Sequence, residues 1–182
     1  MRKVFLIAGL MTAFAVAVVA SSAAANFAGT WTLDKTKSQG LSPRMAGADK
    51  VTWTITQDAA TISIDSKVEG GQPPAGGGGG GGGMGGGRPA AAPAVYKLDG
   101  SEVSSDLNFG QATGKQTLKA TWAGAALELS RKSTFTGQDG TERTTSETRK
   151  LSLSGDGKVL TAAVHSEGGR GGPTDSTLVF NK

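Results

Sequence analysis

Apolar and polar residues alternate with a period of two along most of the chain after residue 26. In residues 51–56, Val51, Trp53 and Ile55 fall on one face of an extended chain, and three threonines fall on the other. Successive side chains of a strand point to opposite faces of its sheet, so this alternation is typical of half-buried antiparallel strands. Threonine suits the polar face because β-branched residues favour extended structure. The pattern predicts strands with one face in a core and one face in water.

The alternation recurs at a spacing of roughly ten residues, with short turn motifs between the runs. Asp-Gly pairs at 99–100 and 139–140 supply the positive φ that tight turns need. Residues 42–48 predict one helical turn, because Pro43 after Ser42 is suited to open a helix. We expect strands at residues 27–33, 51–57, 61–68, 93–98, 103–108, 115–122, 126–136, 142–153, 159–165 and 174–181. About eight to ten such strands in sequence predict an all-β, antiparallel meander that closes into a barrel.

One segment, residues 70–93, breaks the pattern. It contains unbroken glycine from 76 to 83, three further glycines at 85–87 and an alanine-proline stretch. Such a composition offers little apolar surface to offset the entropy of ordering it, so we expect a flexible insert between two strands. A phosphate-binding loop is excluded because no Lys-Ser or Lys-Thr follows the glycines. The insert therefore interrupts a single barrel domain over residues 26–182.

The N-terminal residues have the layout of a secretory signal peptide. Arg2 and Lys3 precede an apolar run over residues 4–20, and Ala23 and Ala25 provide an Ala-x-Ala exit. A membrane anchor is the alternative, but the run is short for a bilayer span and the small-residue exit favours cleavage. We expect a signal peptide over residues 1–25, cleavage near Ala25, and a periplasmic or secreted protein that is not inserted in the membrane.

Composition removes several classes of function. The chain has no cysteine, which excludes disulfides, thiol nucleophiles and thiolate metal sites. It has 19 basic and 15 acidic residues, and two of the basic ones lie in the leader. A chain so close to neutral after cleavage is not built to bind a polyanion, so we expect no nucleic-acid partner.

The sequence contains no recognisable set of catalytic residues. His165 is the single histidine, and no Gly-x-Ser-x-Gly motif accompanies it. Four aspartates fall in predicted turns, where Asx turns account for them, namely Asp58, Asp99, Asp139 and Asp156. We therefore expect no catalytic residues, no metal site and no cofactor, and a protein that is not an enzyme.

Charged residues gather on two neighbouring predicted strands. Arg131-Lys132 lies on one, and Arg143 and Arg149-Lys150 lie on the next, where they are interleaved with Glu142 and Glu147. The pattern favours cross-strand charge pairs on a face in water. An anion-binding patch is the alternative interpretation.

Trp31, Trp53 and Trp122 each stand at an apolar position of a predicted strand. Such residues either pack in the core or line a cavity for an apolar ligand. If the barrel is hollow, we expect Trp53 and Trp122 to lie nearest a ligand.

The stretch that contains Gly29, Thr30 and Trp31 resembles the opening strand of lipocalin-like proteins, which carries Gly-x-Trp. Residues 34–38 and the turn at 154–160 resemble exported bacterial proteins of that type. The resemblance implies a lipocalin-like (calycin) barrel in which Gly29 and Trp31 close one end. It also implies an arginine from a late strand over the tryptophan, and Arg149 is the candidate.

The resemblance implies small-molecule binding but names no ligand. The expected function is that of an exported, monomeric, non-enzymatic barrel that binds a small apolar or amphipathic molecule. The alternative is a structural or interaction module of the cell envelope, with a barrel filled by its own side chains.

Overall fold

The computed structural model describes residues 24–70, 93–109, 112–136, 140–169 and 172–182. Over these residues the chain forms ten strands and one short helix, and every strand pairing is antiparallel. The leader before Ala24 and nearly all of the expected glycine-rich insert lie outside the described residues. The elements are β1 (Gly29–Leu33), α1 (Pro43–Gly47), β2 (Lys50–Gln57), β3 (Thr61–Glu69), β4 (Ala94–Lys97), β5 (Val103–Phe109), β6 (Ala112–Ala123), β7 (Ala126–Thr136), β8 (Glu142–Leu153), β9 (Val159–Glu167) and β10 (Thr174–Asn181).

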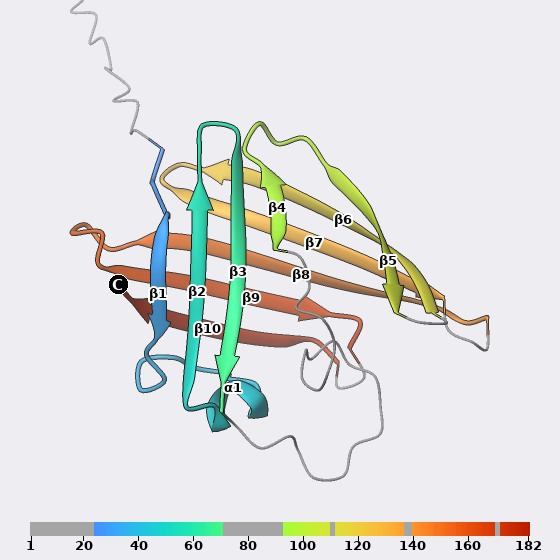
Figure 1. The fold of residues 1–182 in the computed structure, drawn as a ribbon, viewed down its shortest axis with the longest axis horizontal. Helices are drawn as coiled ribbons and strands as arrows, with labels where there is room; N and C mark the ends of the chain where they lie inside the picture. The colour runs from blue at the N-terminus through green and yellow to red at the C-terminus, as the bar shows by residue number, and fades with distance from the viewer. Residues whose placement is uncertain (1–23, 71–92, 110–111, 137–139, 170–171) are drawn as a thin grey trace, which may run out of the picture.

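The strands form one sheet in the order β4-β3-β2-β1-β10-β9-β8-β7-β6-β5. Each strand pairs with its neighbour in sequence, except that β4 and β5 do not pair, and the pairing of β1 with β10 joins the two ends of the meander. In Figure 1 the strands β1, β2 and β3 cross over the long strands β6 to β10, so the sheet wraps around on itself. The predicted all-β meander and its barrel form are therefore confirmed.

The barrel is nearly closed, with one seam between β4 and β5. The two strands contact each other, and β4 also contacts β6, but no ladder of hydrogen bonds joins β4 to either strand. The seam falls here because β4 is only four residues long and pairs with β3 alone. One edge of β4 and one edge of β5 are therefore left without a partner strand.

The apolar phase of the strands points inward, as the alternation predicted. Val51, Trp53 and Ile55 of β2 are each 2% exposed, while the threonines between them are half-buried or exposed. Leu160 and Ala162 of β9 are fully buried in the same way. These residues belong to one continuous apolar core inside the barrel.

Aspartates shape the turns that end several strands. Asp58 Oδ1 accepts hydrogen bonds from the backbone N–H of Ala60 at 2.7 Å and of Thr61 at 2.6 Å, which fixes the turn from β2 to β3. These two N–H donors, with the Thr61 hydroxyl, hold the pKa of Asp58 below its usual value. Asp99 caps the next turn through Ser101 in the same manner. The interpretation of these aspartates as turn residues is confirmed.

The short helix α1 begins where the sequence predicted it. Ser42 is its N-cap, and the Ser42 hydroxyl accepts from the N–H of Met45 at 3.4 Å, while Pro43 opens the first turn. Among the described residues, no helix is long and apolar enough to span a membrane.

Candidate functional site

Trp53 lies deep in the barrel, on the inner face of β2. Its ring centroid is 4.3 Å from that of Phe180 on β10, and the Arg149 guanidinium carbon lies 5.2 Å from the indole centroid. A guanidinium at that distance is attracted by the negative face of the ring. Trp53 therefore stands where the apolar core meets the charged part of the barrel interior.

Trp122 has a different environment, at the end of β6. It is half-buried, and one face stacks on Phe27 with a centroid distance of 6.2 Å. It lines an open depression of about 520 Å³, together with the β2–β3 turn and the start of the β4–β5 turn. The residues that line it are Ala24, Gln57, Asp58, Ala59, Ala60, Thr61, Lys97, Leu98, Asp99 and Trp122. Trp53 is not among them, so of the two tryptophans only Trp122 lines this depression.

Gly29 and Trp31 lie at the same end of the barrel as this depression. Trp31 is fully buried, and its indole N–H donates to the carbonyl oxygen of Phe27 at 2.9 Å. Gly29 has φ +144°, and a Cβ at that position would meet Lys182 Cε at 3.0 Å. Glycine is required there because other residues rarely adopt such a φ. The geometry gives a physical reason for the Gly-x-Trp spacing.

The cation over Trp31 comes from Lys182, not from Arg149. Lys182 Nζ lies 5.3 Å from the Trp31 ring centroid, whereas Arg149 lies over Trp53. The pairing of β1 with β10 explains this placement, because Leu33 opposes Phe180 and the last residue therefore runs alongside Trp31. The expectation that Arg149 covers Trp31 is wrong, since strand register carries that arginine to a different tryptophan.

Phe27 plugs the barrel end and is held there by Gln57. The N–H of Phe27 donates to Gln57 Oε1 at 2.9 Å, and Gln57 Nε2 donates to the carbonyl oxygen of Ala25 at 3.0 Å. The Phe27 side chain is fully buried. The N-terminal segment thus closes the barrel mouth beside the Trp122 depression.

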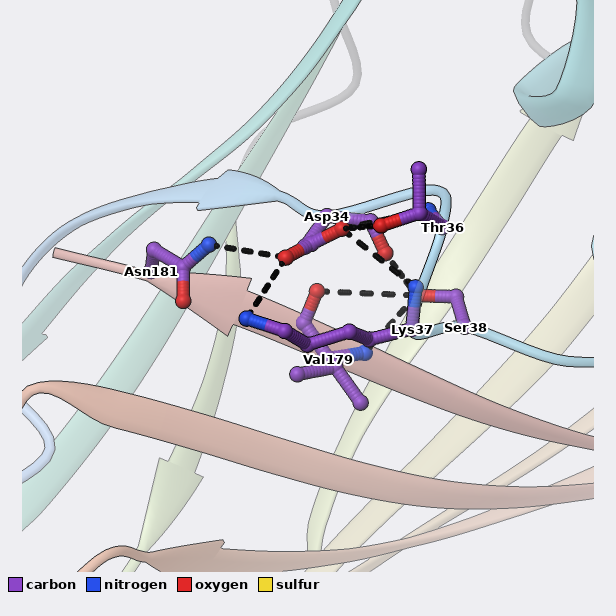
Figure 2. A network of polar contacts seen from close by, with 6 residues as sticks. All are labelled: Asp34, Thr36, Lys37, Ser38, Val179 and Asn181. Atoms are coloured by element: carbon purple, nitrogen blue, oxygen red, sulfur yellow. Dashed lines mark hydrogen bonds and ion pairs between the residues drawn. The ribbon is translucent and has the colours of Figure 1, made fainter.

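Residues 34–38 form a polar network that joins the end of β1 to β10 (Figure 2). The Asp34 carboxylate accepts from the Thr36 hydroxyl at 2.6 Å and from Asn181 Nδ2 at 3.2 Å, and it pairs with Lys37 Nζ at 3.0 Å. These contacts, the Thr36 hydrogen bond first, hold the pKa of Asp34 far below its usual value. The network is a clamp between the first and last strands of the sheet.

Ser38 extends the clamp along β10. Its hydroxyl accepts from the N–H of Val179 at 2.9 Å and donates to the carbonyl oxygen of Asp34 at 2.7 Å. The N–H of Asp34 in turn donates to the carbonyl oxygen of Val179 at 2.7 Å. The motif that resembled exported lipocalin-like proteins therefore has a structural task, which is to continue the pairing of β1 and β10 past the end of the ladder.

A second polar group lies inside the barrel, on the inner faces of β6, β7 and β8. We call Gln116, Arg131, Ser133, Glu147 and Arg149 the inner polar patch. Register places its members side by side: Gln116 opposes Ser133, and Arg131 opposes Glu147. Arg149 follows Glu147 by two residues, so both share one face of β8.

The sequence pattern was interpreted as cross-strand charge pairs on a face in water. That interpretation is wrong for Arg131, Glu147 and Arg149, which lie on the inner faces of their strands. Arg131 continues the inner phase of Leu127 and Leu129 on β7, while Lys132 is exposed on the other face. Glu147 and Arg149 continue the phase of Leu151 in the same way. The sequence did indicate that these three side chains point inward. Alternate residues of a strand lie on the same face of the sheet, whether or not they are apolar.

Charges in the inner polar patch are unevenly matched. Glu147 Oε1 accepts from Arg149 Nε at 2.8 Å and pairs with Nη2 of the same guanidinium at 2.7 Å. Within the part of the chain that the structure describes, Arg131 has no carboxylate partner within 4.0 Å. Two guanidinium groups therefore face one carboxylate, and one positive charge is in excess.

Gln116 is one of two nearly enclosed hydrogen-bonding residues of the patch. The residue is 7% exposed, and its Oε1 has no hydrogen-bond partner among the described residues. An unsatisfied buried acceptor costs about 1–3 kcal/mol, so such a group calls for an explanation.

Tyr96 lies on β4, which contacts β6 of the patch across the seam of the barrel. The residue is 2% exposed. The charges of Arg149, Arg131 and Glu147 all act on the pKa of its phenol. Burial raises the pKa of Tyr96, and the two arginines act in the opposite direction.

His165 lies on the outer face of β9, away from both sites. Its Nδ1 is 2.7 Å from Asp175 Oδ1, and its Nε2 is 3.2 Å from Glu167 Oε1. The Asp175 contact, followed by that of Glu167, raises the pKa of His165 above its usual value. Among the described residues, no three or more histidine, cysteine, aspartate or glutamate side chains are grouped so as to hold a metal ion.

No protein-family model matches the chain, and no curated protein is significantly similar to it. The lipocalin-like resemblance therefore stays a hypothesis about ancestry, separate from the barrel form itself.

Proposed function

We propose that this protein is an exported, non-enzymatic β-barrel that binds a small apolar or amphipathic molecule in the depression beside Trp122. A single observation carries the proposal. An indole half-exposed at the barrel mouth lines a hollow of about 520 Å³, and every residue of its lining except Ala24 belongs to the expected mature chain. That volume falls within the range of about 300–1,000 Å³ that is usual for small-molecule sites.

The lining suits a ligand with one apolar and one polar part. Leu98, Ala59 and Ala60 supply apolar surface beside Trp122, and Lys97 supplies a cation at the rim. Each 100 Å² of apolar ligand surface removed from water contributes roughly 2.5 kcal/mol. After the entropic costs of association, micromolar affinity is expected for a molecule that covers the indole.

A filled structural module is the second candidate, and a specific observation favours it. The Trp53 and Phe180 rings pack against each other inside the barrel, and Phe27 and Trp31 are both fully buried. In that case the Trp122 depression is a surface feature that binds nothing.

Tryptophan fluorescence separates the two candidates. Purified protein is titrated with dodecanoate, cholate and phenylnaphthylamine, each below its micellar concentration. We expect a saturable shift in emission with at least one of them, because a ligand on Trp122 replaces water at the indole.

The matched variants are Trp122→Phe and Trp53→Phe. Phenylalanine preserves aromatic packing in both places, so each variant removes one reporter with little change in shape. The shift should disappear in the Trp122 variant and persist in the Trp53 variant. A shift that persists in the Trp122 variant would place the ligand elsewhere, and no response to any compound would favour the filled module.

A further inference from the structure

The inner polar patch has three properties that a structural ion pair does not explain. It carries an excess guanidinium, Arg131, that has no carboxylate partner among the described residues. It contains Gln116, whose enclosed Oε1 accepts no hydrogen bond there. It also lies inside the barrel, where its charges act on the buried Tyr96 phenol and interact more strongly than in water.

Each property points to a complementary feature in a ligand. A guanidinium presents a planar set of N–H donors that fits a carboxylate. A carboxamide oxygen without a partner fits a hydroxyl donor. Arg149 holds Glu147 with two contacts to one oxygen, which leaves Arg131 as the guanidinium of the patch without a carboxylate partner among the described residues.

Solvent reaches the patch from the side of β8. The Arg149 and Glu147 side chains are 21% and 29% exposed, whereas Gln116 and Ser133 behind them are nearly enclosed. An anion can therefore approach along the arginines, with its hydroxyl directed inward to Gln116.

We propose that the inner polar patch is a binding site for a small hydroxycarboxylate. Arg131 binds the carboxylate, and Gln116 accepts a hydrogen bond from the hydroxyl. This site is distinct from the Trp122 depression, because none of the residues that line the depression belongs to the patch.

Calorimetric titration of the full chain tests the site with three matched probes. Mandelate carries both groups, phenylacetate lacks the hydroxyl, and phenyl glycol has a hydroxymethyl group in place of the carboxylate. We expect mandelate to bind about tenfold or more tightly than either analogue, as expected when a charge-assisted or a buried hydrogen bond is lost. Phenyl glycol binding as tightly as mandelate would overturn the proposal without the use of any variant.

Arg131→Gln and Lys132→Gln form a matched pair of variants. Both remove one positive charge from the middle of β7, but Arg131 faces inward and Lys132 faces solvent. Mandelate affinity should fall about tenfold or more in the first variant and stay within about twofold in the second. Equal losses in the two variants would mean that only overall charge attracts the anion.

Gln116→Met tests the hydroxyl contact. Methionine has a similar length and no amide oxygen, so the variant should bind mandelate and phenylacetate equally, with phenylacetate affinity unchanged. Retained preference for mandelate would overturn the role of Gln116. Trp122→Phe should leave mandelate binding intact, so failure here is distinguishable from failure at the depression.

Discussion

Single residues show most clearly how this fold assigns different tasks to similar side chains. Trp31, Trp53 and Trp122 all stand at apolar phases, yet one seals the barrel end, one meets a guanidinium, and one is half-exposed at a depression. Hydropathy cannot distinguish these tasks, because the indole is equally apolar in all three positions. Neighbours from other strands decide them.

Trp31→Ala tests the sealing role. The side chain is fully buried and its N–H is satisfied by Phe27, so the variant loses both apolar packing and a hydrogen bond. Unfolding free energy should fall by about 3–5 kcal/mol, the usual range for removal of a large buried aromatic side chain. Urea unfolding measures the loss, with Thr30→Ala as an exposed control on the same strand. If the free energy of unfolding of the variant lies within about 1 kcal/mol of that of the parent, Trp31 does not seal the barrel.

Asp34→Asn tests the clamp between β1 and β10, and its effect should depend on pH. The folded protein holds the pKa of Asp34 below its usual value, chiefly through Thr36. The ionised carboxylate therefore stabilises the fold above the ordinary aspartate pKa of about 3.9, and this contribution is lost as the pH falls toward the lowered value. The variant should be less stable than the parent at pH 7 and the difference should shrink below about pH 4.

Asp65→Asn is the control for the clamp, because Asp65 is an exposed carboxyl on β3. Urea unfolding of both variants from neutral to acid pH gives the comparison. Parallel pH profiles for the two variants would argue against a stabilising clamp at Asp34.

At the scale of elements, strand positions follow from local pattern more closely than strand partners do. The expected strands at 126–136, 142–153 and 174–181 have the observed bounds of β7, β8 and β10. The expected strand at 115–122 was too short, since β6 begins at Ala112 and Gly114 interrupts the alternation there. Glycine carries no side chain to mark a face, so pairing with β7 extends a strand that the pattern did not reveal.

Shortening the insert tests a connection between two elements. Ala94, the first residue of β4, pairs with Ile64, and β3 continues five residues beyond Ile64 to Glu69. The chain between Glu69 and Ala94 must therefore span at least about 17 Å. Deleting residues 76–87 leaves twelve residues between Glu69 and Ala94, with an extended reach of about 40 Å. The unfolding free energy should change by less than about 2 kcal/mol, because loop closure depends weakly on length.

The control for this deletion is removal of residues 154–157, which form a hydrogen-bonded turn between β8 and β9. That deletion should abolish cooperative unfolding. A comparable loss on deletion of residues 76–87 would show that the insert packs on the barrel.

At the scale of the whole molecule, the last strand, β10, pairs with the first, β1, and the seam of the barrel lies between β4 and β5. The β1–β10 pairing, the Asp34 clamp and Lys182 over Trp31 together hold the two ends of the described chain. The unpaired edges fall instead on β4 and β5, on either side of the barrel seam. Stability of the closed form therefore depends on contacts between residues far apart in sequence.

Export with removal of residues 1–25 is the prediction that belongs to this scale. Cleavage after Ala25 removes one acceptor of Gln57 but leaves the hydrogen bond from Phe27 to Gln57 Oε1, so the plug should stay in place. Intact mass of the exported protein should correspond to a chain that starts at Asn26. An Ala25→Arg variant should retain its leader, because a small residue is needed at the exit. A mature parent that keeps residues 1–25 would contradict the signal-peptide assignment.

The sequence by itself determined the class of fold, the positions of most strands and the face on which each side chain lies. These properties follow from a period of two, from threonine on the outer phase and from aspartates at turns, all of which act between near neighbours. Even the inward direction of Arg131 and Arg149 was encoded in their phase, although their charge suggested the outer face.

Only the tertiary structure decided which strands meet and what each inward side chain faces. Register between β7 and β8 gathers the inner polar patch, and the pairing of β1 with β10 places Lys182 rather than Arg149 over Trp31. The seam at β4 and the separation of Trp53 from Trp122 have the same origin. Each depends on contacts across the closed sheet between residues that are distant in sequence. A local pattern of apolar and polar residues carries no information about such partners.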